Sequence, residues 1–194
     1  MSKPEELKVV SLVGVRGTIL RPVMQSDIPL AMKWMNDPEV SEFLNSHLPL
    51  TLKNEEEWYN GVSSDKNQAV FIIVVKDCPI GIMGIHRINW FDRTATTGAV
   101  IGEKEYWGKG YGTDAKMILL DYAFNTLNLR KIFSSVIAFN KRSLQYSLHC
   151  GYVLEGRGRQ EIFRKGRYWD RIILGLFKRE WLPHWRSYKK KFAQ

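Results

Sequence analysis

The feature that most constrains the fold is a glycine-rich loop between a predicted strand and a predicted helix. Gly108, Gly110 and Gly112 stand at alternate positions, after a strand expected at residues 94–101 and before residues 114–127, whose apolar side chains recur at helical spacing. Glycine lets the backbone turn tightly and approach a ligand. The first N–H groups of a helix lack partners and carry partial positive charge. The arrangement therefore predicts a site for phosphate or pyrophosphate.

Two common phosphate-binding patterns do not fit this loop. A P-loop has four residues between its first glycine and the Gly-Lys pair, whereas five residues separate Gly102 from Gly108-Lys109. A dinucleotide fingerprint has the spacing G-x-G-x-x-G, whereas the glycines here follow G-x-G-x-G. Taken alone, the loop also fits a glycine-rich turn that holds no ligand.

The remaining pattern predicts one α/β domain over residues 1–194, with a mixed, mostly antiparallel central sheet flanked by helices. Short turns link the early strands and favour an antiparallel meander, and a hairpin around Lys165-Gly166 closes the chain. Strands are expected at residues 15–23, 69–76, 80–89, 94–101, 131–139, 152–154, 161–164 and 168–177, and helices at 28–35, 55–62, 114–127 and 143–150.

Composition narrows the class of protein further. No apolar run approaches the ~20 residues that cross a membrane, and residues 1–7 do not resemble a signal peptide. Cys78 and Cys150 are the only cysteines, so a reduced, cytoplasmic compartment is expected. The four histidines lie far apart in the sequence, and no metal site is predicted.

The net charge of +9 is concentrated near the C-terminus. Residues 156–194 contain twelve lysines and arginines against three acids, which accounts for the whole excess. Within them, residues 183–194 interleave basic and aromatic side chains, a pattern typical of proteins that bind single-stranded nucleic acid. Two interpretations remain open: a ribosome- or RNA-binding segment, and a solvated hairpin and tail.

Several motifs together resemble the GNAT superfamily of acetyl-CoA-dependent N-acetyltransferases. Residues 106–115 resemble its coenzyme motif, Gln/Arg-x-x-Gly-x-Gly/Ala, with Trp107 at the first position. Asn140-Lys141-Arg142-Ser143 followed by Gly151-Tyr152 resembles the family's Asn-x-x-Ser…Gly-Phe. The motifs at residues 20–22, 34–40 and 166–170 look most like the branch of the RimJ and RimL ribosomal-protein acetyltransferases. The resemblance covers roughly residues 16–182 and leaves 183–194 as a tail.

The resemblance implies a fold in which a splayed pair of parallel strands holds coenzyme A. The loop amides would bind the pyrophosphate, the pantetheine arm would follow the strand, and an asparagine would anchor it. The amine then attacks the thioester directly, with no covalent enzyme intermediate. The implied coenzyme-binding residues are Val100, Ile101, Trp107, Gly108, Lys109, Gly110, Tyr111, Gly112, Thr113, Asn140 and Ser143.

The catalytic positions of the family are only partly matched. Thr96 stands where many relatives carry the base carboxylate, and Ser147, with Tyr146 beside it, stands where they carry the acid tyrosine. RimL-type enzymes pair a serine, here Ser143, with a glutamate at the position of Ile162, beside Glu161. The candidates are therefore Ser143, with Tyr146 and Glu161 as secondary ones. Ser143 also fits a cap or a pantetheine-orienting role. A water chain could serve as the base, and a pseudoenzyme that only binds acetyl-CoA is the alternative.

The family builds its acceptor groove from the first helices and the closing hairpin. The substrate-side candidates are Trp34, Trp90 and Tyr168, with Phe43, Trp58 and Trp169, although core packing is the favoured interpretation of each. The acceptor is expected to be a protein N-terminal amine or a small-molecule amine. An α-amine, with a pKa of about 7.7–8.0, is partly neutral near pH 7, and a charge of +9 does not favour a polyamine. Relatives are often dimers, so a homodimer is also expected.

Overall fold

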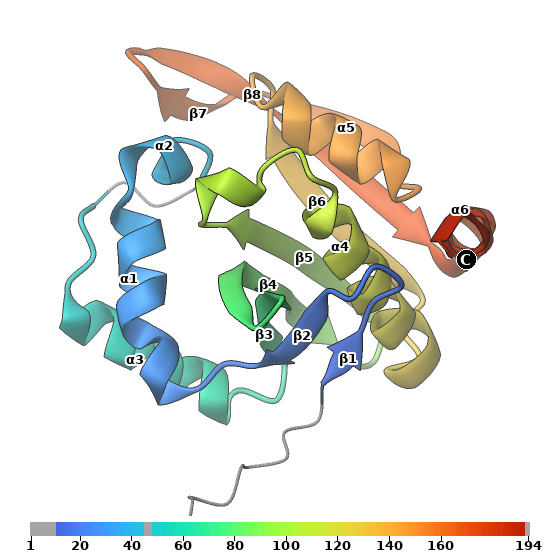
Figure 1. The fold of residues 1–194 in the computed structure, drawn as a ribbon. Helices are drawn as coiled ribbons and strands as arrows, with labels where there is room; N and C mark the ends of the chain where they lie inside the picture. Colours follow the sequence, from blue (N-terminus) through green and yellow to red (C-terminus); the bar gives the residue numbers. More distant parts are fainter. Residues whose placement is uncertain (1–10, 45–47, 193–194) are drawn as a thin grey trace, which may run out of the picture.

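The computed structural model describes residues 11–44 and 48–192. Eight strands form one sheet in the order β1-β2-β3-β4-β5-β6-β8-β7 (Figure 1). The strands are β1 Leu12–Val13, β2 Ile19–Pro22, β3 Ala69–Val75, β4 Cys78–Asn89, β5 Thr94–Ile101, β6 Lys131–Ile137, β7 Val153–Arg164 and β8 Arg167–Phe177. The helices are α1 Ile28–Asn36, α2 Pro38–Ser41, α3 Leu52–Ser64, α4 Tyr111–Asp121, α5 Lys141–His149 and α6 Lys178–Phe192.

All neighbouring strands are antiparallel except β5 and β6. These two pair only over Thr94–Thr96 and Lys131–Phe133, although both strands continue past this point. Beyond it β6 pairs with β8 alone on its other side. The expected α/β class, the mixed, mostly antiparallel sheet and the splayed parallel pair are therefore confirmed. The halves of β5 and β6 that do not pair with each other leave a gap between them in the middle of the sheet.

Helices cover both faces of the sheet. On β3, Ile73 and Val75 belong to the large core that α4 completes, whereas Ile72 and Val74 pack with Trp34 of α1. Adjacent strand residues point to opposite faces. The two clusters therefore lie on opposite sides, and Figure 1 shows α1 and α3 together away from α4.

Most predicted elements form close to their expected positions, and the first strand is the main correction. The expected strand at residues 15–23 is wrong in its first half, because residues 14–17 form a turn. The Gly14 N–H donates to the Thr18 carbonyl at 2.7 Å, and the Gly17 N–H donates to the Gly14 carbonyl at 3.1 Å. The strand β2 therefore begins only at Ile19. The helix expected at 55–62 begins earlier, since Thr51 and Asn54 form a capping box ahead of it.

The C-terminal segment is also different from the expected tail. Residues 183–192 continue α6, in which Trp181 and Trp185 are buried against the main core. The rings of Trp181 and Phe124 lie 5.4 Å apart. The aromatic side chains therefore pack in the core. They do not form the surface for stacking nucleic-acid bases that the alternation of basic and aromatic residues suggested.

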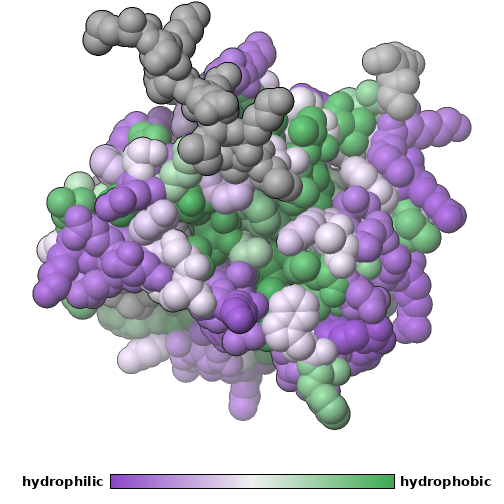
Figure 2. Space-filling model, turned by 90° about the horizontal axis from the view of Figure 1, so that it is seen from below, coloured by the Kyte–Doolittle hydropathy of each residue, from purple (hydrophilic) through white to green (hydrophobic). Residues whose placement is uncertain are grey.

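Figure 2 shows one face of the molecule on which hydrophobic side chains gather in the middle and hydrophilic side chains cover most of the margin. In the part of the chain that the structure describes, no helix is long and apolar enough to cross a membrane.

Candidate functional site

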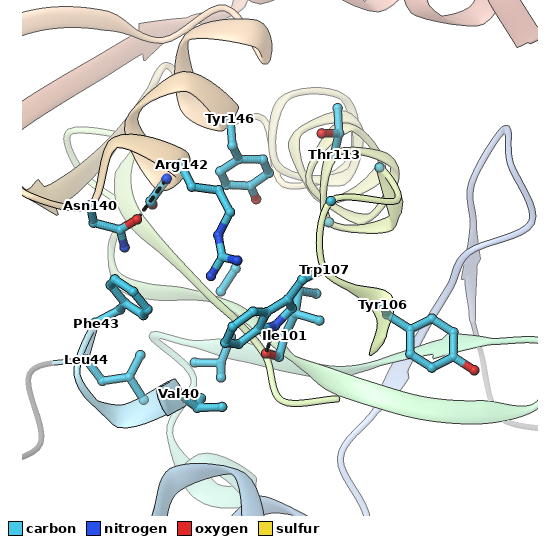
Figure 3. A pocket seen from close by; sticks show the side chains of 16 residues that line it. Val40, Phe43, Leu44, Ile101, Tyr106, Trp107, Thr113, Asn140, Arg142 and Tyr146 are labelled. Atoms are coloured by element: carbon cyan, nitrogen blue, oxygen red, sulfur yellow. Dashed lines mark hydrogen bonds between the residues drawn. The ribbon is translucent and has the colours of Figure 1, made fainter. Parts of the chain in front are cut away.

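A cavity of about 270 Å³ opens where β5 ends and the glycine loop begins. Its walls come from four segments: the end of β5, the loop before α4, the start of α5, and residues 40–44 at the end of α2 (Figure 3). The cavity therefore lies over the gap that the diverging strands β5 and β6 leave. The lining residues are Val40, Phe43, Leu44, Ala99, Val100, Ile101, Tyr106, Trp107, Gly108, Gly110, Gly112, Thr113, Asn140, Arg142, Ser143 and Tyr146.

The glycine loop has a backbone that other residues adopt with difficulty. Gly108 and Gly110 have φ angles of 73° and 84°, in the left-handed region that favours glycine. A Cβ added to Gly110 would collide with the guanidinium of Arg16, which donates to the carbonyl of Lys109 at 3.0 Å. Helix α4 begins directly afterwards, at Tyr111. Its first N–H groups have no partner within the helix, so this end of the cavity suits an anionic phosphate group.

Trp107 and Arg142 form one wall of the cavity. The indole Nε1 of Trp107 donates to the carbonyl of Ile101 at 2.7 Å, which fixes the ring beside the end of β5 (Figure 3). The Arg142 guanidinium lies 4.1 Å from the centre of that ring. This cation–π contact holds a permanent positive charge at the cavity.

Helix α5, which carries Arg142, and its N-cap Asn140 supply further polar groups to the cavity. Asn140 caps the helix, because its Oδ1 accepts from the N–H of Ser143 at 3.0 Å. The Tyr146 hydroxyl is buried and has no hydrogen-bond partner among the described residues. Burial raises the pKa of Tyr146 well above its usual range, so the hydroxyl stays protonated. A buried donor without a partner is available to a bound molecule.

A second and larger cavity, of about 900 Å³, is lined by α3 on one face of the sheet and reaches Lys116 of α4 on the other face. It shares seven lining residues with the first cavity: Phe43, Leu44, Ala99, Val100, Asn140, Ser143 and Tyr146. The two cavities thus meet in the gap between β5 and β6.

Two titratable side chains in the second cavity were not predicted as site residues from the sequence. His86 of β4 stands directly opposite Thr96 of β5 in the strand register, and both residues line the cavity. Glu55 of α3 is 5% exposed, also lines the cavity, and burial raises its pKa. Neither belongs to a motif, and only the pairing of β4 with β5 and the position of α3 bring them to the site.

A buried polar chain connects α4 to the same cavity. The Lys116 Nζ donates to the Thr97 Oγ1 at 2.9 Å, and this hydroxyl shares a hydrogen bond of 2.7 Å with the Tyr152 hydroxyl. Burial lowers the pKa of Lys116 to about 8. Lys116 is therefore a buried amine that keeps most of its charge at pH 7 and loses it at mildly alkaline pH.

Nine of the eleven expected coenzyme-binding residues line the first cavity. The side chains of Lys109 and Tyr111 lie outside its lining, because both pack against the Tyr106 ring. Of the catalytic candidates, Ser143 and Tyr146 line both cavities. Glu161 lines neither and pairs with Arg171 at 2.6 Å. Ile162, at the expected position of the family glutamate, does line the second cavity.

The three main substrate-side candidates do not reach either cavity. Trp34 is 1% exposed, and its Nε1 donates to Glu103 at 2.7 Å as part of the core. Trp90 donates to Asn67 at 3.1 Å outside the cavity, and Tyr168 packs against Phe163 on the exposed hairpin. The aromatic residues that do line the second cavity are Phe43, Trp58, Phe133 and Tyr146.

Comparisons with known proteins agree with this arrangement. The model of the acetyltransferase (GNAT) domain matches residues 18–153. An N-acetyltransferase of Bacillus licheniformis, p20, whose name calls it uncharacterized, is 30% identical over 84% of this chain and 93% of its own length. The spermidine N(1)-acetyltransferase of Escherichia coli K12 is 25% identical over 87% of this chain and 90% of its own. The crystal structure of a Vibrio cholerae spermidine N-acetyltransferase in complex with CoA and spermine superposes with a TM-score of 0.80, at 26% identity, over 85% of this chain and 98% of that one.

Proposed function

Because this chain belongs to the GNAT family of acetyltransferases and is an acetyl-CoA-dependent N-acetyltransferase, we propose that its acceptor is a primary amine on a small molecule. The observation that carries this proposal is the junction of the two cavities in the gap between β5 and β6. A cosubstrate in the first cavity and an acceptor in the second would meet at Ser143 and Tyr146. The matched relatives named for spermidine support a small acceptor.

The first cavity fits acetyl-CoA, which supplies the thioester. The N–H groups at the start of α4 and the Arg142 charge would hold its phosphates, and the apolar walls at Val100 and Ile101 would hold its pantetheine arm. The amide nitrogen of Asn140 is not used by the cap and remains available to the arm. The Tyr146 hydroxyl would protonate the leaving thiolate, because it is a buried and unpartnered donor.

The charges of the second cavity favour an amine that carries no further positive charge. Glu55 is the one acid among the described residues that line it, whereas Arg87, Lys116 and Arg171 are basic. Arg171 is neutralised by Glu161, and Arg87 is exposed with no ion pair among the described residues. Glu55 would hold a single ammonium group, and Arg87 would attract a carboxylate or phosphate. An amino acid or a similar zwitterion therefore fits better than a polyamine.

Two experiments test this function. Calorimetric titration with acetyl-CoA should give micromolar binding. A thiol-release assay should then compare spermidine, an amino sugar, free amino acids and a short peptide with a free N-terminus. We expect small amines to react and zwitterionic ones to have the highest kcat/KM. Turnover of the peptide alone would contradict the small-molecule proposal and favour the protein N-terminal acceptor of the RimJ and RimL branch. A preference for spermidine would overturn only the argument from charge.

A further inference from the structure

We propose that His86 is the general base of this enzyme and takes over the role of the carboxylate that is absent at Thr96. The inference rests on the proposed function, since it places the acceptor amine in the second cavity. The imidazole of His86 would accept a proton from the amine nitrogen as the nitrogen bonds to the acetyl carbon. This assignment follows from the position, the hydrogen bonding and the surroundings of the ring.

The strand register brings His86 to the acceptor side of the gap. His86 pairs with Thr96, and the preceding pair on the same face is Gly84 with Gly98. A Cβ added to Gly84 would lie 2.6 Å from the His86 Nε2, and one added to Gly98 would lie 3.8 Å from it. The ring therefore lies over these two glycines, and any larger residue at Gly84 would displace it.

The same geometry aims the ring at the reacting centre. Gly98 lies two residues before Val100 on the same face of β5, which spans roughly 7 Å of strand. Val100 lines both cavities, and His86 lines the second. An amine nitrogen between the ring and Val100 is within reach of the Nε2, directly or through one water.

The hydrogen bonding of the ring leaves the correct nitrogen free. The Nδ1 of His86 lies 3.3 Å from the Gln68 Oε1. Because that oxygen only accepts, the Nδ1 carries the proton and the Nε2 keeps its lone pair. No hydrogen bond to the Nε2 is made by the described part of the chain. The Nε2 is therefore a free acceptor on a ring that lines the cavity.

The charges around the ring keep it neutral. Burial lowers the pKa of His86, and the positive charges of Lys116 on α4 and Arg87 on β4 lower it further. Glu55 on α3 and Arg171 on β8 line the same cavity, and Glu161 neutralises Arg171. A neutral imidazole is the form that accepts a proton.

The reaction balances with these groups. The amine lone pair forms the C–N bond, and the His86 Nε2 takes one proton from the nitrogen. The C–S bond breaks with its electron pair on sulfur, which receives the proton of the Tyr146 hydroxyl. The imidazolium then returns its proton to the phenolate through solvent, so that no other reactant is consumed.

The experiment compares His86→Gln and His86→Ala with His149→Gln, whose ring is on the exposed side of α5. For both His86 variants, kcat/KM on the best amine should fall roughly 10²- to 10⁴-fold. The acetyl-CoA Kd should stay within about twofold, since His86 does not line the first cavity. In the wild type, kcat/KM should fall as the pH is lowered through a pKa below 6.5. This acid limb of the pH profile should be absent from His86→Ala. Added imidazole should partly restore that variant.

A second readout needs no turnover. Imidazole resonances of the uniformly labelled protein should show one ring that titrates below the ordinary histidine pKa and is missing from the His86→Gln spectrum. A His86 pKa above 7, or variants that keep kcat/KM within threefold together with the acid limb, would overturn the inference. If the wild type acetylates only peptides, the proposed function fails and the same variants, measured on the peptide, still decide the role of His86.

Discussion

The hydroxyl of Tyr188, in the last turns of α6, donates a hydrogen bond of 3.0 Å to the Oδ1 of Asp114, in the first turn of α4. Asp114 is fully buried, and its other oxygen accepts from the N–H groups of Arg16 and Thr18 at 3.1 and 3.2 Å. One carboxylate thus joins three segments from both ends of the chain. The helix that carries the coenzyme loop is fixed partly through the C-terminal helix.

Tyr188→Phe should therefore destabilise the protein. The Asp114 Oδ1 loses its one hydrogen bond from a described residue, and a buried carboxylate that loses a donor costs about 1–3 kcal/mol. Denaturant unfolding measures the change. Tyr168→Phe is the matched control, because Tyr168 is 61% exposed on the hairpin and should shift the free energy of unfolding by less than about 0.5 kcal/mol. Equal stability of the Tyr188 variant and the wild type would contradict the role of this contact.

Lys116 should give the stability a distinct pH dependence. Its folded pKa is lowered to about 8, whereas an unfolded lysine titrates near 10.4. Between these values the unfolded state binds more protons, so the contribution of Lys116 to the free energy of unfolding rises with pH across this window. Below pH 8 the burial penalty is constant, at roughly 3 kcal/mol.

Lys116→Met should remove this penalty. At pH 7 the variant is expected to be more stable than the wild type by up to that amount, and the difference should shrink as the pH approaches 10. Unfolding measured at several pH values, as the difference between the two proteins, isolates Lys116 from other titrating groups. Lys66→Met on the exposed surface is the control. A difference that does not change with pH would contradict the assignment.

Tyr146→Phe should separate activity from stability. The hydroxyl has no partner among the described residues, so its removal costs no hydrogen bond and should leave the free energy of unfolding unchanged or slightly raised. If it protonates the thiolate, kcat should fall roughly 10²-fold with the acetyl-CoA Kd unchanged. The control is Tyr152→Phe, which loses the bond to Thr97 and should be less stable. Full activity of the Tyr146 variant would rule out its role as the acid.

Gly110→Glu should abolish acetyl-CoA binding. The substitution places a side chain at a φ of 84°, against Arg16, and adds a negative charge where the pyrophosphate is expected. Gly166→Glu is a matched control, because Gly166 has a φ of 74° in the open hairpin turn and faces no atom within 4 Å. Calorimetry should show a loss of at least 100-fold in affinity for the first variant and an unchanged Kd for the second.

Arg87→Glu should change the choice of acceptor. The substitution reverses the charge of an exposed cavity-lining arginine that has no ion pair among the described residues, so kcat/KM for spermidine should rise relative to that for a zwitterionic amine by about tenfold. Arg93→Glu is the matched control, since Arg93 is also exposed with a positive φ but lies in the turn outside the cavity. An unchanged ratio would show that Arg87 does not select the acceptor.

The sequence alone was sufficient for the fold class and for most of the first cavity. The glycine loop, the helix after it and the Asn-x-x-Ser motif are local patterns, in which residues a few positions apart meet because the backbone is helical or turns at a glycine. These motifs carry the resemblance to the GNAT family, and it was this resemblance that implied a common coenzyme site for Trp107, Gly108, Asn140 and Ser143.

The acceptor side depended on tertiary structure. His86, Glu55 and Lys116 are separated along the chain by 31 and 30 residues and share no motif. The pairing of β4 with β5, the register that opposes His86 to Thr96, and the packing of α3 and α4 on opposite faces bring them together. Likewise, the sequence does not distinguish Trp34 and Trp185 from aromatic residues that bind a ligand. Only their surroundings in the tertiary structure show that both are buried. Local patterns fix which way a segment turns, but burial and contact between distant segments arise only when the sheet assembles, and these decided which charged groups line the second cavity.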